Sequence, residues 1–353
     1  MLPYLVFFGL FALGSLMTRP DLRSYKPVGP LLIAGAILVA VMIGLRDRVG
    51  VDWANYLQIW AAAGRLSLGR LISAYGSDPA FYALTWVMRG AGLPFWMLNL
   101  LCAAIFTWGL FAFARMMPNP WLAVAAAIPY LVIVVAMSGV RQATAIGFLF
   151  LALRAFRRLR TGAFLGWVAA AAAFHASAIL VVPFAGLSLA RSRFQSLVLL
   201  TVTLIAGYFL LGSSFDQYAG DYLSGRSVES SGAIFRVAMS ALAAALFFTF
   251  YRQLPLDEHE RILWRNFALL ALASVPLLMI VPSTTALDRM LLYIYPLQLL
   301  AFASAPLMLA PNNRGHQILL TLMILAYHLA IMLVFFGFAV NRAPYLPYRN
   351  YLF

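Results

Sequence analysis

The chain has 353 residues, of which 64% are hydrophobic and only 10% are charged, whereas a soluble globular protein carries about 25% charged residues. Long apolar runs recur from end to end, which excludes a separate soluble domain and predicts one integral-membrane domain over residues 1–353. The net charge is +14, but the basic residues are spread over short loops, so we expect no nucleic-acid partner. A single cysteine excludes a disulfide and a thiolate metal site.

The apolar runs are continuous rather than alternating, which predicts membrane helices and not a barrel. We expect an all-α polytopic transmembrane bundle of about 10–13 helices, some re-entrant or broken. The first run lacks a basic leader and a small-residue cleavage pattern, so it is interpreted as a retained helix. In chain order the segments are 2–17, 28–45, 79–93, 94–114, 120–137, 141–156, 162–174, 176–190, 195–211, 233–251, 266–281, 289–309 and 317–340.

Basic short loops indicate which ends of the helices face the cytoplasm. The outer face then receives loops at about 46–78 and 212–232 and the tail 341–353. If every segment between the outer loop at 46–78 and Arg154 crossed the membrane once, Arg154 would lie on the outer side, although its basic loop indicates the cytoplasm. One segment between Pro79 and Met137 must therefore be broken or re-entrant, and the candidates are 79–93 and the segment containing Pro129. The cytoplasmic loops are Arg19–Lys26, Arg154–Arg160, Arg191–Arg193, Arg252–Arg265 and Pro311–His316.

Two polar residues, Arg141 and His175, lie beside apolar runs on either side of the basic turn Arg154–Arg160. Ionisable groups at membrane depth are costly and often mark a functional site. Each is separated from the turn by about 14–15 residues, or roughly 21–23 Å of helix, so both are expected near the outer face of a core about 30 Å thick. Alternatively, Arg141 snorkels to the lipid headgroups, and His175 only packs between helices.

Arg141 and Gln142 open a helix, whose N-terminus favours anions, so this pair predicts an anion site. His175 is a candidate base near neutral pH. A second cluster follows the helix 28–45, where Arg46 is a candidate anion ligand and Asp52 a candidate base or helix cap. Alternatively, this second cluster is the start of a capped interfacial helix that carries Tyr56 on an aromatic face.

Further polar candidates lie in the second half of the chain. Arg236 stands early in a helix, and Arg289 follows Asp288, with which it alternatively pairs. The tail, which contains Tyr348, is expected to be an aromatic plug or one wall of a sugar groove. No P-loop, zinc motif or paired-aspartate nucleotide-sugar motif occurs, so we expect no metal and no other cofactor.

Several segments, taken in order, resemble one family. RDRVGVDWANY resembles the R-x-x-x-G-x-D-x-x-x-Y signature of EpsG-type polysaccharide polymerases. SDPAFYALTWVMRGAGLPFWMLN, SGVRQATAIGFLFLAL with FHASAILVVP, DRMLLYIYPLQLL and the PYRNY tail are similar to the segments that follow in that family. The chain lacks the long periplasmic loop of many related Wzy polymerases.

This resemblance implies a Wzy-like, GT-C-type integral-membrane glycosyltransferase of the bacterial inner membrane. Its donor and acceptor would be oligosaccharides linked to undecaprenyl pyrophosphate, joined at the outer face, with a chain-length regulator or export machinery as candidate partners. Preorganised arginines would stabilise the pyrophosphate leaving group without metal. The candidates are Arg46, Arg141, Arg236 and Arg289, with Gln142, Tyr56 and Tyr348 as further substrate contacts and His175 or Asp52 as the base.

Two other functions fit the sequence less well. A flippase for lipid-linked glycans is expected to have duplicated halves, and we find no duplication. Another membrane glycosyltransferase or acyltransferase remains an alternative, although an acyltransferase is expected to carry histidine and aspartate in one short motif, and His175 has no acidic neighbour in the sequence.

Overall fold

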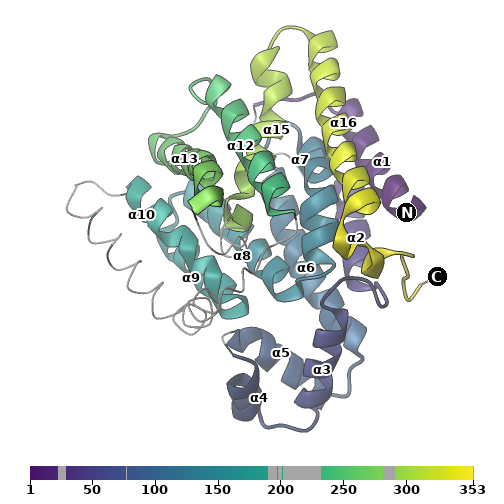
Figure 1. The fold of residues 1–353 in the computed structure, drawn as a ribbon. Helices are drawn as coiled ribbons and strands as arrows, with labels where there is room; N and C mark the ends of the chain where they lie inside the picture. The colour runs from purple at the N-terminus through teal and green to yellow at the C-terminus, as the bar shows by residue number, and fades with distance from the viewer. Residues whose placement is uncertain are drawn as a thin grey trace.

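The computed structural model describes residues 1–22, 29–76, 78–189, 197, 201, 232–280 and 291–352. Within these ranges every regular element is helical, and the only extended pairing is a bridge between Arg46 and Asn350. The predicted all-α polytopic bundle is therefore confirmed (Figure 1). The elements are α1 (Leu2–Met17), α2 (Pro30–Gly44), α3 (Trp53–Ala63), α4 (Leu68–Tyr75), α5 (Pro79–Gly90), α6 (Phe95–Ala114), α7 (Pro120–Ala127), η1 (Ile128–Ala136), α8 (Val140–Arg157), α9 (Thr161–Phe174), η2 (Ala176–Val181), α10 (Val182–Leu189), α12 (Ala233–Phe250), α13 (Glu258–Ile280), α15 (Pro296–Leu309), α16 (Arg314–Phe338) and η3 (Val340–Tyr345).

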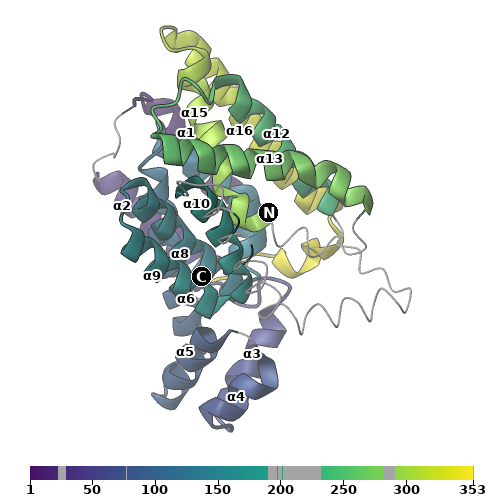
Figure 2. The same cartoon turned by 90° about the vertical axis from the view of Figure 1, so that its left-hand side faces the viewer.

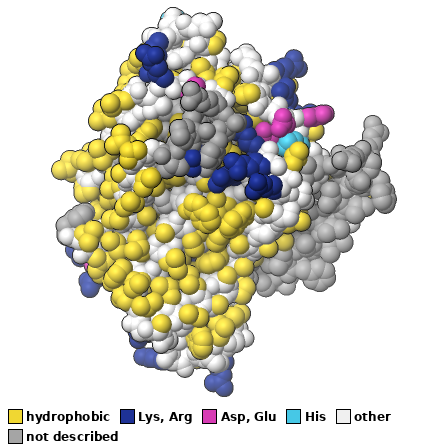
Figure 3. All heavy atoms as spheres, turned by 180° about the vertical axis from the view of Figure 1, so that it is seen from behind, with side chains coloured by type: hydrophobic (Ala, Val, Ile, Leu, Met, Phe, Trp, Pro, Cys, Tyr) yellow, Lys and Arg dark blue, Asp and Glu magenta, His cyan; other side chains and the backbone are white. Residues whose placement is uncertain are grey.

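The chain is a multi-pass membrane protein. Among the described residues, 5 helices are long and apolar enough to cross a bilayer, and further apolar helices have 10–17 residues. Hydrophobic side chains cover much of the surface seen in Figure 3, and the basic side chains on that face are confined to separate patches. Many large hydrophobic side chains are exposed, among them Leu31, Leu165 and Met323. Such exposure is expected where lipid replaces water as the solvent.

The two ends of the bundle are defined by its loops. The tail end holds residues 340–352, and the turn end holds residues 158–160. The Tyr4 hydroxyl donates to the carbonyl of Tyr345 (2.9 Å), so α1 begins at the tail end. Arg314 donates to the carbonyl of Leu16 (3.2 Å), so α1 finishes beside the start of α16 at the other end.

Helices α3, α4 and α5 form a layer beyond the tail end of the bundle (Figures 1 and 2). This layer has its own aromatic core, which includes Trp60, Phe81 and Phe95. Because α5 belongs to it, the 79–93 segment does not cross between the ends. Helix α6 then runs from the tail end to the turn end, α7 and η1 return to the tail end, and α8 runs to the turn end again. With α5 left out, the number of crossings places Arg154 at the turn end, as its basic loop requires.

Pro129, the other suspect, lies where the helix begun by α7 widens into the π-helix η1. Proline has no N–H and cannot make the ordinary i→i−4 bond, and the wider winding is seen at the end of η1, where the amide of Met137 donates to the carbonyl of Val132 (3.2 Å). The segment is thus altered in its winding but still traverses the bundle. π-Helical segments are frequent at functional sites.

Helices α6 and α8 touch through their backbones. A Cβ atom on Gly109 would lie 2.0 Å from the carbonyl oxygen of Gly147, and one on Gly147 would lie 2.6 Å from the Cα of Phe106. Small residues allow this close approach inside a membrane. The contact holds α8, and with it Arg141, against the first half of the bundle.

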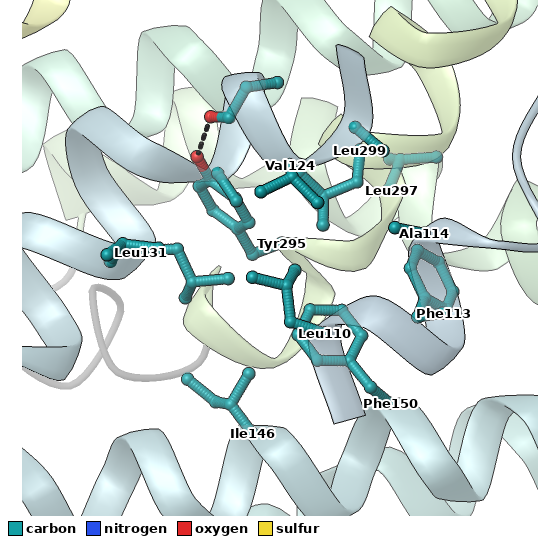
Figure 4. Packing of buried hydrophobic residues seen from close by; sticks show 14 of the residues in the cluster. Leu110, Phe113, Ala114, Val124, Leu131, Ile146, Phe150, Tyr295, Leu297 and Leu299 are labelled. Carbon is teal, nitrogen blue, oxygen red and sulfur yellow. Dashed lines mark hydrogen bonds between the residues drawn. The ribbon is translucent and has the colours of Figure 1, made fainter. Parts of the chain in front are cut away.

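The main core fills the space between α6, α7, α8 and α15 (Figure 4). Leu110, Phe150 and Leu299 are packed there with at most 1% of their surface exposed. Tyr295 crosses the same core, and its hydroxyl donates to the carbonyl of Ala126 (3.2 Å), the dashed contact in Figure 4. A buried tyrosine needs such a partner.

The C-terminal tail is bonded to the bundle through its tyrosine hydroxyls. The Tyr348 hydroxyl donates to the carbonyl of Met42 (2.9 Å), and the Tyr345 hydroxyl donates to that of Val134 (3.0 Å). Burial raises the pKa of Tyr348 to about 12, so its phenol stays protonated as a donor. Arg289, Asp288 and most of the expected loop 212–232 lie outside the described residues.

Candidate functional site

The buried carboxylate of Asp78 joins three segments at the tail end of the bundle. Asp78 is the residue before α5, and Pro79 at the first helical position fixes where that helix begins. Its side chain is only 4% exposed. Oδ2 accepts a hydrogen bond from Nη1 of Arg141 (2.7 Å) and lies 3.4 Å from Nδ1 of His175, while Oδ1 accepts from the amide of Ala176 (3.3 Å). Arg141 and His175 therefore meet at one carboxylate.

Arg141 lies in the first turn of α8, within a cage of aromatic rings. Its Nη1 also donates to the hydroxyl of Tyr82 (2.8 Å). Its Cζ lies 5.9 Å, 6.0 Å and 5.9 Å from the rings of Tyr56, Phe81 and Tyr82, within the range of cation–π attraction. The two Nη1 contacts use both protons of that nitrogen, and the side chain is 31% exposed. A further side-chain hydrogen bond links Arg141 to Tyr56, and the other N–H groups of the guanidinium are the donors that remain for a ligand among the contacts of the described residues.

His175 lies at the break between α9 and η2. Its backbone is extended (φ −158°, ψ 110°), so the helix ends here and the next amide, that of Ala176, is turned toward Asp78. The imidazole is 20% exposed. Since Nδ1 faces the carboxylate, Nε2 is the ring nitrogen left to meet a substrate. This is the arrangement by which a carboxylate fixes the tautomer of a catalytic histidine.

The charges around Asp78 favour its ionised form. Burial alone raises the pKa of this carboxyl, but the hydrogen bond and charge of His175 and the nearby Arg141 guanidinium lower it more. The net pKa of Asp78 lies below its ordinary value. The carboxylate is thus a fixed negative charge that holds one cation and orients one imidazole.

Arg46 does not join this cluster. It is 1% exposed, its Nε donates to the carbonyls of Met137 (2.8 Å) and Val49 (3.1 Å), and its Nη1 donates to that of Ile43. Its guanidinium lies 5.5 Å from the Trp53 ring. In this structure Arg46 ties the end of α2 to the loop before α8, and its side chain is buried.

Asp52 lies at the predicted N-cap position of α3, but its carboxylate does not cap the helix. Instead Oδ2 accepts from the hydroxyl of Ser138 (3.1 Å), next to the start of α8. Tyr56, one turn further, accepts a long hydrogen bond from the amide of Arg141 (3.5 Å). The Asp52 carboxylate is therefore a neighbour of the Arg141 region without contacting Arg141 or His175.

The other predicted contacts are dispersed. Gln142 is half-buried, and its Nε2 has no partner among the described residues. Arg236 lines a separate pocket with Tyr130 and Gln298. Tyr348 is buried in the tail, where its hydroxyl is bonded as described above. The roles of all these residues stay predictions.

Sequence reasoning missed Asp78 as a site residue. It stands within the SDPAFYALTW segment that resembles the family, directly before a proline that starts a helix. In a chain with only 11 acidic residues, an aspartate between two apolar stretches is a signal in itself. Its partner His175 is 97 positions away, so no local motif links the two.

Comparison with known proteins identifies the family of the chain. No curated protein matches the chain, and no solved structure matches it. A family model described as the EpsG family matches residues 31–350, which include Asp78, Arg141 and His175. The chain therefore belongs to the EpsG family, the EpsG-type polysaccharide polymerases.

Proposed function

We propose that this protein polymerises oligosaccharide repeat units carried on undecaprenyl pyrophosphate, at the outer face of the bacterial inner membrane. Family membership supports polymer synthesis. The observation that carries the chemical assignment is the meeting of a partly exposed arginine and a partly exposed histidine at the buried carboxylate of Asp78. Kinship with GT-C glycosyltransferases is part of the same proposal and agrees with the all-helical bundle.

In the proposed reaction the acceptor hydroxyl attacks the anomeric carbon of the donor glycan. A new C–O bond forms there, and the bond to the lipid pyrophosphate breaks, with its electron pair leaving on the phosphate oxygen. Nε2 of His175 takes the hydroxyl proton, while Asp78 holds Nδ1 and stabilises the imidazolium that forms. The contact of 3.4 Å between Nδ1 and Oδ2 is long, as is common before substrate binds.

Arg141 is the proposed ligand of the leaving group. Negative charge grows on the pyrophosphate as the bond breaks, and a preorganised guanidinium stabilises it most when water is excluded. The bond to Asp78 fixes the orientation of Arg141, and the N–H groups that are not bonded to Asp78, Tyr82 or Tyr56 are available to phosphate oxygens. Arg46 is left out of this role because it is buried among carbonyl groups.

The base assignment has one competitor, Asp52. Its carboxylate is bonded to Ser138 rather than to a cation or an imidazole. His175 is preferred because its environment provides both an orienting carboxylate and a free nitrogen. Substituting Asp52 and His175 one at a time distinguishes the two candidate bases, because only loss of the true base should abolish glycan transfer.

Acyl transfer is the second candidate function. Although His175 has no acidic neighbour in the sequence, the fold provides one in Asp78, and an Asp–His pair also serves acyl transfer. The absence of a short His/Asp motif therefore does not exclude that class.

The test is the composition of lipid-linked glycans in a strain that lacks this gene. Polymerase function predicts loss of polymer and accumulation of single repeat units on lipid at the outer face. Accumulation at the inner face instead favours a flippase. Normal polymer that lacks only acyl groups would favour the acyltransferase.

A further inference from the structure

Four side chains of the α3–α5 layer surround the guanidinium of Arg141, which itself lies on α8 of the bundle (Figures 1 and 2). They are Tyr56, Asp78, Phe81 and Tyr82. Asp78 supplies the counter-charge, and the rings of Tyr56 and Phe81 supply cation–π contacts. Tyr82 does more than add a third ring, because its hydroxyl also bonds the cation directly.

The hydroxyl of Tyr82 is held between two partners. The side chain is 0% exposed, and its hydroxyl donates to the carbonyl of Tyr75 (2.8 Å) and accepts from Nη1 of Arg141 (2.8 Å). A phenol has a single proton. Because the bond to Tyr75 uses that proton, the phenol oxygen can only accept where it meets Arg141. The direction of both hydrogen bonds is therefore fixed.

The local fold explains why this tyrosine has such a carbonyl within reach. Tyr75 ends α4, and the carbonyls of the last helical turn have no partner within the helix. Gly76 follows with a φ of +96°, which lets the chain leave the helix at once. The amide of Tyr82 donates to the carbonyl of Asp78 (3.3 Å), so these two residues share one face of the first turn of α5. The start of α5 thus presents a carboxylate and a phenol to the same nitrogen, Nη1 of Arg141.

A phenol suits this position better than a second carboxylate. Asp78 already balances the charge of Arg141, and another negative charge would oppose the binding of an anion. Tyr82 accepts the second proton of Nη1 without adding charge. A guanidinium is planar, so two acceptors on the protons of one nitrogen fix its plane. They thereby fix where the remaining N–H groups of Arg141 point.

We propose that Tyr82 is a positioning residue, which sets the direction in which Arg141 presents its remaining N–H groups to the pyrophosphate of the donor. Tyr82 acts through Arg141 and not on the reacting atoms. The inference rests on the proposed polymerase function, in which Arg141 binds the leaving group. It makes the α3–α5 layer the part of the molecule that orients the cation of the site.

The test is the affinity of purified full-length protein in lipid nanodiscs for inorganic pyrophosphate, measured by calorimetry without turnover. The variants are Tyr82→Phe, Arg141→Ala and the two combined. The matched control is Tyr4→Phe. Tyr4 is also 0% exposed, and its hydroxyl also donates to a backbone carbonyl, that of Tyr345 (2.9 Å), at the same end of the bundle.

We expect Tyr82→Phe to weaken pyrophosphate binding about threefold to tenfold, because Asp78 still holds Arg141. Tyr4→Phe should leave the affinity unchanged. The thermal unfolding midpoints of the two variants should fall by similar amounts, since each loses a bond from a phenol to a carbonyl. In the Arg141→Ala background, Tyr82→Phe should have no further effect on the affinity, which a general loss of packing would not predict.

A second variant serves if Tyr82→Phe yields no folded protein. Tyr82→3-fluorotyrosine keeps the ring and the hydroxyl, but fluorine withdraws electron density and makes the phenol oxygen a weaker acceptor. We expect weaker pyrophosphate binding with an unchanged unfolding midpoint. An affinity equal to that of the wild type would then count against the positioning role.

The inference alone fails if Arg141→Ala loses pyrophosphate binding while Tyr82→Phe keeps it, if Tyr4→Phe shows the same loss as Tyr82→Phe, or if Tyr82→Phe weakens binding equally in the Arg141→Ala background. If the wild type binds no pyrophosphate, or Arg141→Ala binds it as well as the wild type, the role of Arg141 fails together with the inference. Failure of the polymerase assignment would instead appear as normal polymer in the deletion strain.

Discussion

Replacing Asp78 with asparagine removes the charge that joins Arg141 and His175 while it keeps the shape of the side chain. A hydrogen bond to a charged partner contributes about 1.5–3 kcal/mol, and every 1.36 kcal/mol corresponds to about a tenfold change in rate. Because the Arg141 side chain is 31% exposed, solvent screening moves the expected effect toward the lower end. We expect glycan transfer to slow about tenfold to a hundredfold, since the imidazolium loses its counter-charge and Arg141 its anchor.

The assay is the rate at which purified protein adds lipid-linked repeat units to a growing chain. The matched control is Glu260→Gln at the turn end, where Glu260 is a buried carboxylate 3.6 Å from Nε of Arg157. This control replaces another buried carboxyl group that lies next to an arginine but touches no proposed site residue. Equal rates for Asp78→Asn and wild type, or an equal loss in both variants, would refute the reasoning, the second by showing that the loss is one of folding.

Four further predictions follow from particular contacts. Arg46→Met leaves three buried carbonyls without their donor, so the amount of folded protein and its thermal unfolding midpoint should fall sharply, whereas a ligand role alone predicts a stable, inactive protein. Gly109→Ala pushes α6 from α8 and should cost about 1–3 kcal/mol of stability, measured by thermal unfolding, and an unchanged midpoint would contradict the contact. Asp78 has a pKa below 3.8, so its stabilising contribution is present above that pH and is lost only as pH falls through the lower folded-state value. The thermal unfolding midpoint should therefore show no loss of the Asp78 contribution between pH 8 and 5, and a loss in that range that is absent in Asp78→Asn would contradict the lowered pKa. Asp52→Asn should keep most of the activity, and its complete loss would transfer the role of base to Asp52.

Much of the fold followed from the sequence, because bilayer physics leaves few choices. Continuous apolar runs predicted helices, and the distances of Arg141 and His175 from the basic turn placed both at one end of the bundle, where they meet. Crossing parity also required one irregular segment between Pro79 and Met137. The sequence did not show that α5 lies in a separate layer, since that depends on the aromatic core it shares with α3.

The site was less predictable, because its centre depends on long-range contacts. Asp78 and His175 are brought together only when α9 ends beside α5, and neither residue has a local motif. Arg46 carried the same outward features as Arg141, an arginine next to an apolar helix. What separates them is the set of backbone carbonyls that closes around Arg46, and no spacing in the sequence reveals that set.

The central claim is that Asp78, Arg141 and His175 form the centre of a glycan polymerase. The most direct measurement gives purified protein in vesicles a single substrate, the lipid-pyrophosphate-linked repeat unit, in the presence of a metal chelator. The proposal predicts a ladder of glycans with two, three and more repeats, released lipid pyrophosphate in equal number to the new bonds, and no ladder with Arg141→Ala. Repeat units that stay single with the wild-type protein, or a full ladder with Arg141→Ala, would contradict it.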